Sequence, residues 1–146
     1  MKNFAVIGYG GQGAWHCSQI LKSDVAHLCG VYDIKQVRRT AAAQAGIHVY
    51  ESNETIFADP AVDVVVIATP NDVHDELAVA ALRAGKHVIC EKPVEMSVKS
   101  LDHMIAAAEQ SGKVLTVHQN RRWDVDFLAM KQVAHSGQIG ELIHIE

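Results

Sequence analysis

The 146-residue sequence lacks several features that would each indicate a particular class of protein. No apolar run approaches the roughly 18 residues that a membrane-spanning helix needs. The net charge of -4 gives no basic footprint for nucleic acid, and residues 1–3 lead straight into an apolar run without the plan of a signal peptide. The three cysteines, Cys17, Cys29 and Cys90, form no C-x-x-C pair. We therefore expect a cytoplasmic protein with buried free thiols, whose partners include neither a membrane nor a nucleic acid.

Strand-length apolar runs alternate with helical segments along the sequence, and 49% hydrophobic residues suffice for a sizeable core. This alternation predicts an α/β fold, a doubly wound parallel sheet of the Rossmann type with helices on both faces. The predicted strands are residues 4–7, 28–32, 49–50, 62–68, 87–90 and 114–117. The predicted helices are residues 11–22, 35–45, a helical turn from 52 or 53, 72–84, 97–112 and 124–135.

A glycine-rich segment, Gly8-Tyr9-Gly10-Gly11-Gln12-Gly13, joins the first predicted strand to the first predicted helix. Gly8 permits a tight turn, Gly10 lets the backbone approach a pyrophosphate, and Gly13 lets the helix pack closely on the sheet. The free amides and the positive dipole end of the helix would then face the phosphates. The glycine spacing alone would also fit a turn that binds nothing. The strand before it and the helix after it favour a dinucleotide site.

Asp33 ends the second predicted strand, twenty residues past Gly13. An acid at this place accepts hydrogen bonds from the adenine ribose and repels a 2′-phosphate. The sequence therefore predicts NAD as cofactor, with NADP less favoured. Lys35, Arg38 and Arg39 are evidence against this preference, because a cation near the ribose can hold a 2′-phosphate.

Polar side chains follow three further predicted strands at the edge where such sheets bind ligands. They are Thr69-Pro70-Asn71 with His74, then Glu91-Lys92-Pro93, then His118-Gln119-Asn120-Arg121-Arg122-Trp123. Each also has an ordinary explanation, as a helix cap (Asn71), a solvated position (His74), a surface lysine (Lys92), an ion pair with Asp124 or Asp126 (Arg121 and Arg122) or a core position (Trp123). We expect no metal site, because His87 and Cys90 face opposite ways on a strand and His16 and Cys17 are adjacent on a helix.

Together these segments resemble the glucose–fructose oxidoreductase and inositol dehydrogenase family (Gfo/Idh/MocA). The resemblance runs from the glycine segment through residues 68–74, 84–88, 91–93 and 118–123 to residues 137–146. It implies an NAD(P)-dependent oxidoreductase that acts on a sugar, an inositol or a related polyol, as a homo-oligomer in the intact enzyme. An alternative from another class is a non-catalytic NAD(H)-binding module with a regulatory or redox-sensing role.

The resemblance also assigns roles to particular residues. Lys92 is the expected catalytic residue and contacts substrate near the nicotinamide, and a cis bond often precedes the proline that matches Pro93. Glu91 matches a residue near the nicotinamide ribose. The expected cofactor-binding residues are Gly8, Tyr9, Gly10, Gly11, Gln12, Gly13, Asp33, Thr69, Pro70, Asn71, His74, Glu91 and Lys92. The expected substrate-binding residues are Lys92, Asn120, Arg121 and Trp123.

Two regions follow from this comparison. Residues 1–120 are the expected dinucleotide-binding domain, and residues 121–146 a connecting helix and the first strand of a second α/β domain. That domain supplies most substrate contacts in the family, usually with a catalytic histidine, and we expect it to be missing here. Residues 141–146 alternate apolar and polar side chains, as a half-buried strand does. We expect this segment to be disordered or to pair with a neighbouring molecule.

Overall fold

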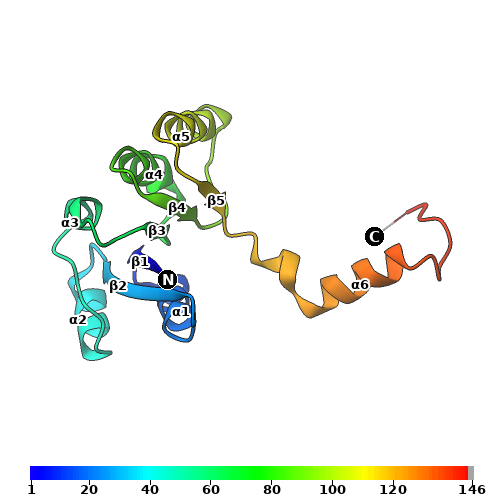
Figure 1. Cartoon of the computed structure of the whole chain (residues 1–146), viewed down its shortest axis with the longest axis horizontal. Helices are drawn as coiled ribbons and strands as arrows, with labels where there is room; N and C mark the ends of the chain where they lie inside the picture. Colours follow the sequence, from blue (N-terminus) through cyan, green and yellow to red (C-terminus); the bar gives the residue numbers. More distant parts are fainter. Residues whose placement is uncertain (145–146) are drawn as a thin grey trace.

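The computed structural model describes residues 1–144 and contains a parallel sheet with helices on both faces, as predicted (Figure 1). Within this range the sheet has five strands in the order β2-β1-β3-β4-β5. The strands are β1 (Lys2–Ile7), β2 (Ala26–Tyr32), β3 (Val64–Ile67), β4 (His87–Cys90) and β5 (Leu115–Val117).

The helices alternate with these strands. They are α1 (Gly11–Leu21), α2 (Gln36–Gln44), α3 (Asn53–Ala58), α4 (His74–Arg83), α5 (Val98–Ser111) and α6 (Val125–His135), with two short 3₁₀ helices, η1 (Asn71–Val73) and η2 (Asn120–Trp123). None of the helices in the described part of the chain combines the length and apolar character needed to cross a bilayer.

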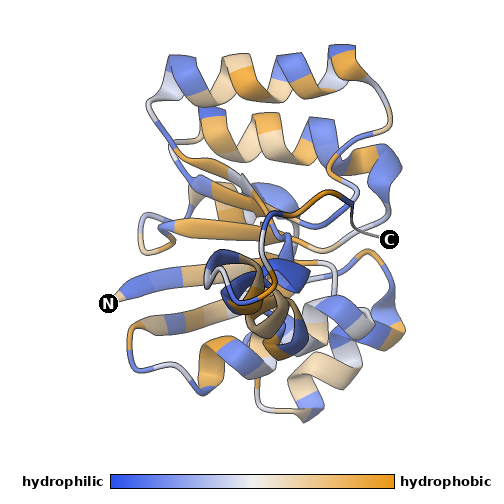
Figure 2. Ribbon diagram, turned by 90° about the vertical axis from the view of Figure 1, so that its right-hand side faces the viewer, coloured by the Kyte–Doolittle hydropathy of each residue, from blue (hydrophilic) through white to orange (hydrophobic). Residues whose placement is uncertain are grey.

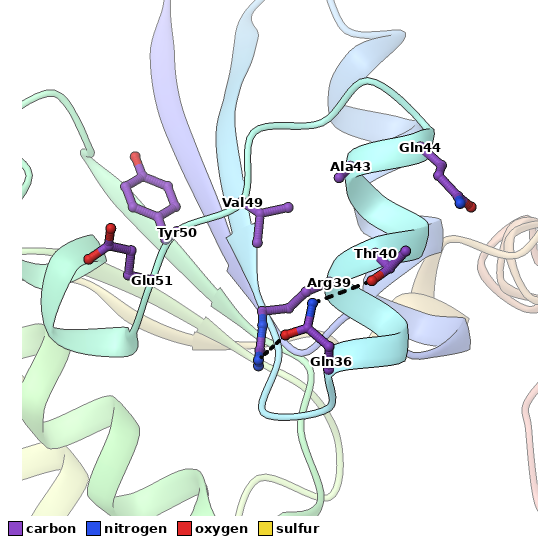
Figure 3. A pocket seen from close by; sticks show the side chains of 8 residues that line it. All are labelled: Gln36, Arg39, Thr40, Ala43, Gln44, Val49, Tyr50 and Glu51. Carbon is purple, nitrogen blue, oxygen red and sulfur yellow. Dashed lines mark hydrogen bonds between the residues drawn. The ribbon is translucent and has the colours of Figure 1, made fainter.

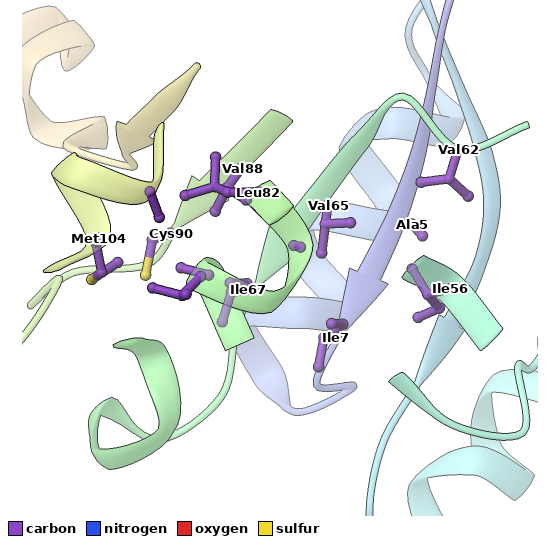
Figure 4. Packing of buried hydrophobic residues seen from close by; sticks show 14 of the residues in the cluster. Ala5, Ile7, Ile56, Val62, Val65, Ile67, Leu82, Val88, Cys90 and Met104 are labelled. Atoms are coloured by element: carbon purple, nitrogen blue, oxygen red, sulfur yellow. The ribbon is translucent and has the colours of Figure 1, made fainter. Parts of the chain in front are cut away.

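The two faces of the sheet bury separate apolar clusters, because successive side chains of a strand point to opposite faces. In β3 all four residues are buried, with Val65 and Ile67 on one face and Val66 on the other. The first face packs on α3, α4 and α5 (Figure 4), and the second on α1 and α2. Figure 2 shows the largely hydrophobic strands lying between these two helical layers. This explains why β3 reads as an uninterrupted apolar run.

Local signals set several helix ends. Ser97 precedes α5, and its side chain accepts a hydrogen bond from the Ser100 amide at 3.1 Å. Gly112 ends the same helix with a φ of 64°, a conformation that glycine adopts without strain. A capping box between Ser52 and Thr55 begins α3. These caps place the helix boundaries within a few residues of the predicted ones.

The predicted strand at residues 49–50 is wrong. Only a single parallel bridge joins Val49 to Val31, with hydrogen bonds from the Val31 amide to His48 and from the Tyr50 amide to Val31. Two residues are too few to extend this bridge before α3 begins. When the bridge is counted beside β2, the order matches that of the dinucleotide-binding fold, 3-2-1-4-5-6.

Residues 141–144, expected to belong to the first strand of a second domain, form no strand here and are exposed, and the expectation stays a prediction. Residues 145 and 146, where the rest of that prediction falls, lie outside the described part. Alternating side chains define a strand face, but a strand also needs a sheet with which to pair. Here α6 leads the segment away from the sheet (Figure 1), and α6 itself contains no buried residue. Pairing with a neighbouring molecule stays a prediction.

Candidate functional site

The glycine segment forms a tight turn between β1 and α1, at the carboxyl end of the sheet. Gly8 has a φ of +93°, and a Cβ on it would lie 2.5 Å from the carbonyl oxygen of Ala68. A Cβ on Gly13 would overlap the carbonyl oxygen of Gly8. Close packing of α1 against β1 and the end of β3 therefore requires both glycines.

The first turn of α1 is bare where a ligand can approach it. Gly10 is the N-cap, and no side chain caps the helix amides. An added Cβ on Gly11 would meet nothing within 4 Å, and one on Gly10 would meet only the Arg38 guanidinium, at 3.3 Å. An uncapped helix start with exposed amides is a site for a phosphate group.

Asp33 lies beside this turn, with 3% of its surface exposed. Its carboxylate accepts hydrogen bonds from the amides of Tyr9 (2.7 Å) and Lys35 (2.8 Å) and from the Arg38 guanidinium (3.2 Å). Burial alone would raise the pKa of Asp33, but these hydrogen bonds outweigh it and the pKa is lowered. The lowered pKa keeps the carboxylate ionised, so that it can accept hydrogen bonds from a ligand.

A cavity of about 380 Å³ opens between the ends of β1, β2 and β3. Its lining includes Gly8, Asp33, Arg38, Thr69 and Pro70. The Thr69 hydroxyl oxygen is buried without a hydrogen-bond partner in the described structure. An unpaired buried hydroxyl costs free energy, so a polar ligand group here would stabilise it. Together the bare helix start, the ionised acid and the cavity fit one half of a nicotinamide dinucleotide.

A second hollow, of about 580 Å³, lies between α2 and residues 49–51 (Figure 3). Arg39 and Gln36 are neighbours on α2 and line one side of it, with 2.6 Å between the guanidinium nitrogen and the amide oxygen. None of its lining residues belongs to the glycine segment, and Asp33 is not among them. The smaller cavity is therefore the better candidate for a cofactor site.

On the other side of the glycine segment lies Glu91, directly after β4, with 5% of its surface exposed. One carboxylate oxygen, Oε1, lies 3.0 Å from the Gln12 amide nitrogen, 2.7 Å from His16 Nε2 and 2.8 Å from His118 Nδ1. The other, Oε2, accepts the Lys92 amide at 3.2 Å. Burial alone would raise the pKa of Glu91, but the hydrogen bonds from His16, Gln12 and His118 outweigh it and lower the pKa.

The meeting of His16 and His118 at Glu91 was not predicted from the sequence. The sequence places His118 after the last predicted strand but assigns it no role, and it offers His16 only beside Cys17 as a metal ligand. A signal was present, because His16 is three residues after Gly13 and so shares its sheet-facing side of α1. The expected absence of a metal site rests on two other pairs, His87 with Cys90 and His16 with Cys17, and it stays a prediction.

The three ligand-type atoms of this group lie within 4.8 Å of one another. Both histidine nitrogens are 2.7–2.8 Å from the same carboxylate oxygen. Ligands of a tetrahedral zinc ion at about 2.0–2.1 Å stand roughly 3.3–3.4 Å apart, so the observed spacing is that of hydrogen bonds. An ionised carboxylate can only accept, and each of the two ring nitrogens therefore carries a proton.

Lys92 is exposed, and its ammonium has no partner among the described residues. The Lys92–Pro93 peptide bond is cis, in agreement with the resemblance. Asn71 does not cap α4, since it begins η1 without a capping bond and its amide lies 3.9 Å from Met96 Sδ. Lys92, whose ammonium is unpaired among the described residues, lies at the same sheet edge as Glu91.

The proposed solvated position for His74 is wrong, because His74 is fully buried. Its ring nitrogens lie 3.1 Å from the Thr69 carbonyl and 3.2 Å from the Val94 carbonyl. The ring therefore supports the segment after β3 from within the protein. A direct contact between His74 and a cofactor stays a prediction, which this burial disfavours.

Asn120, Arg121 and Trp123 lie on η2, and none of them lines the 380 Å³ cavity. Arg121 pairs with Asp124 at 2.6 Å, so the ion-pair explanation of this arginine is correct. Trp123 is 75% exposed and is not a core residue. Their expected contact with substrate stays a prediction.

Comparisons with known proteins agree with this geometry. The family model GFO_IDH_MocA, described as an oxidoreductase family with an NAD-binding Rossmann fold, matches residues 2–119. A structure described as an NAD-binding protein from Listeria innocua is 48% identical with a TM-score of 0.92, over 96% of this chain and 42% of that one.

Two relatives have names that state an activity. Myo-inositol 2-dehydrogenase from Thermotoga maritima is 32% identical over 93% of this chain and 41% of that protein. The scyllo-inositol 2-dehydrogenase (NADP(+)) IolW from Bacillus subtilis is 29% identical over 94% of this chain and 38% of that protein. The chain thus spans about two fifths of these relatives. It belongs to the Gfo/Idh/MocA oxidoreductase family, whose NAD-binding Rossmann fold it contains.

Proposed function

We propose that this chain is the cofactor-binding half of an NAD(P)-dependent oxidoreductase that transfers hydride between a nicotinamide and a sugar, an inositol or a related polyol. The observation that carries the proposal is the uncapped start of α1 next to the buried, ionised Asp33. The glycine segment would hold the pyrophosphate, and Asp33 would accept the ribose hydroxyls. Two relatives named as inositol dehydrogenases support the substrate class.

When bound, the nicotinamide would supply the hydride acceptor or donor. Lys92 would stabilise negative charge on the substrate oxygen as the alkoxide develops, because its ammonium is free and lies at the same sheet edge. The Thr69 and Pro70 segment, supported from behind by His74, would form the cavity wall between the two halves of the cofactor.

We further propose NAD as the preferred cofactor, because the ionised Asp33 would repel a 2′-phosphate. Arg38 weakens this preference, since its guanidinium lies 3.2 Å from the same carboxylate. One relative is named for NADP(+), whereas the matching family model is described as NAD-binding. Titration of the 146-residue chain with NADH and NADPH tests the preference, and equal or tighter NADPH binding would contradict it.

Lys92→Ala in the intact enzyme tests the catalytic proposal. We expect kcat to fall about 100-fold or more, because the charge acts mainly in the transition state, while NAD affinity changes little. The matched control is Lys99→Ala, an exposed lysine on α5 outside the cavity. A loss of NAD affinity with unchanged kcat would instead make Lys92 a nucleotide contact.

The second candidate function is a regulatory or redox-sensing module that binds NAD(H) without catalysis. The unpaired ammonium of Lys92 favours the enzyme, since a sensor has less need of it. The 146-residue chain by itself should bind NAD(H) yet show little polyol-dependent NADH formation, because substrate positioning can account for about 7–11 kcal/mol of a barrier. Robust turnover by this chain would contradict that expectation. A cytoplasmic location and a homo-oligomeric intact enzyme complete the proposal.

A further inference from the structure

Two buried carboxylates flank the glycine segment, and the same stretch of chain contacts both. Asp33 follows β2 and Glu91 follows β4, with β1 and β3 between them in the sheet. The Tyr9 amide bonds to Asp33, and Gln12 and His16 bond to Glu91. The start of α1 therefore lies between two fixed negative charges.

The position of Glu91 places it toward the second half of a dinucleotide. In this fold a dinucleotide crosses the point where the strand order reverses, which here lies between β1 and β3. The adenosine half belongs with the acid after β2, so the nicotinamide half extends toward the end of β4. Glu91 ends that strand, and the next residue is Lys92.

The hydrogen bonds around Glu91 fix its direction. Oε1 accepts from Gln12 and His16 on α1 and from His118 after β5. Oε2 accepts only the Lys92 amide among the described residues, so it is the oxygen that has accepting capacity left. Side chains from two other parts of the fold, α1 and the segment after β5, thus hold the carboxylate, while Oε2 keeps a lone pair for a ligand hydroxyl.

Trp15 completes the cluster. The His16 and His118 rings lie edge to face, 4.6 Å between centroids, and Trp15 lies 5.1 Å from His16 and 5.5 Å from His118. Ring packing of this kind restrains the two imidazoles, so their protonated nitrogens stay directed at Glu91.

We propose that His16 and His118 are positioning residues for the nicotinamide half of the cofactor, which they serve by holding Glu91 with its Oε2 directed to the ligand. This inference rests on the proposed function, since it requires a dinucleotide at this edge. It assigns the histidines a specific requirement, a hydrogen-bond donor at Nε2 of His16 and at Nδ1 of His118. A purely structural role would instead affect every ligand of the fold equally.

Amide side chains test this requirement because they supply a donor without an imidazole ring. Glutamine places its amide nitrogen near the position of histidine Nε2, and asparagine places its amide nitrogen near Nδ1. The variants are His16→Gln and His118→Asn, each compared with its alanine counterpart. The control is His103→Ala, because His103 also contacts a carboxylate, that of Asp75 at 3.0 Å, but is exposed on α5.

The measurement is calorimetric titration of the 146-residue chain with NAD and with ADP, which lacks the nicotinamide ribose. We expect His16→Ala and His118→Ala to weaken NAD binding about tenfold and ADP binding less than twofold, the size expected for a hydrogen bond to a charged group. The amide variants should stay within about twofold of the wild type for both ligands, as should His103→Ala.

Several results would overturn the proposal. Equal losses for NAD and ADP would make the histidines structural. If the alanine variants do not fold, the amide variants test the proposal by themselves. An NAD affinity about tenfold below wild type in either amide variant would show that a hydrogen-bond donor to Glu91 is not enough. Zinc binding by the wild type that both amide variants lose would assign the cluster to a metal. A wild-type chain that binds neither nucleotide would contradict the proposed function, and the positioning role with it.

Discussion

Arg38 is the residue on which cofactor preference depends most directly. Its guanidinium lies 3.2 Å from Asp33 and reaches over Gly10, so it offsets part of the charge that would repel a 2′-phosphate. We expect Arg38→Gln to weaken NADPH binding about tenfold while NADH binding changes less, because the carboxylate is then uncompensated. Paired titrations of wild type and variant with both cofactors measure this. Stronger NADPH binding by the variant would show that Asp33 does not discriminate.

A pH dependence follows from His16. Burial lowers its pKa below the ordinary value of 6.5, although the hydrogen bond to Glu91 opposes this. The folded chain therefore binds a proton at His16 less readily than the unfolded chain. This residue contributes its full stabilisation above about pH 6.5. The contribution is lost as the pH falls from 6.5 toward the lower pKa of His16 in the folded chain. The lowered pKa values of Asp33 and Glu91 act in the same direction at more acidic pH.

We expect His16→Gln, which has no titrating group, to lose less stability than the wild type between about pH 7.5 and about pH 5.5. Urea unfolding at both pH values measures the difference. His103→Gln is the control, because its imidazole is exposed. If the unfolding free energy of the His16→Gln variant falls between these pH values as much as that of the wild type, the lowered pKa assigned to His16 is wrong.

At the scale of elements, the glycines around the start of α1 have two different functions, and some are needed for packing while others are needed for binding. Gly13→Ala should destabilise the chain by about 2 kcal/mol or more, because the new methyl group overlaps the backbone of Gly8. Gly10→Ala meets only a flexible guanidinium and should cost little stability, but it should weaken NAD binding. A Cβ on Gly11 meets nothing within 4 Å, so Gly11→Ala is the control for stability alone. Chemical unfolding and NAD titration of the three variants check this, and a harmless Gly13→Ala would contradict the packing argument.

The same scale shows what a sequence can predict. Apolar runs and capping residues such as Ser97 and Gly112 specify elements locally, and these elements were found within a few residues. The sheet edge where ligands bind also followed, because strand ends are known once strands are. The strand predicted at residues 49–50 was not found, because strand pairing depends on a partner that no local pattern reveals. The contact between His16 and His118 similarly depends on how α1 and β5 approach Glu91.

At the scale of the whole molecule, α6 contributes little to the body that binds the cofactor. It contains no buried residue, it packs against η2, and Figure 1 shows it projecting away from the sheet. The family match likewise ends at residue 119. A chain shortened after Trp123 should therefore keep NAD affinity within about twofold, and its unfolding free energy within about 1 kcal/mol of the full chain.

A shorter chain that ends at Gly112 is the matched control. It removes β5, which pairs with β4, and it also removes His118 from Glu91. We expect this chain to be unfolded or to have lost several kcal/mol of stability, because β4 becomes an exposed edge and a buried carboxylate loses a donor. Urea unfolding and NAD titration of both shortened chains separate the contribution of α6 from that of β5 and His118. If loss of α6 alone abolishes binding, the cofactor site extends beyond the sheet and the boundary near residue 120 is wrong.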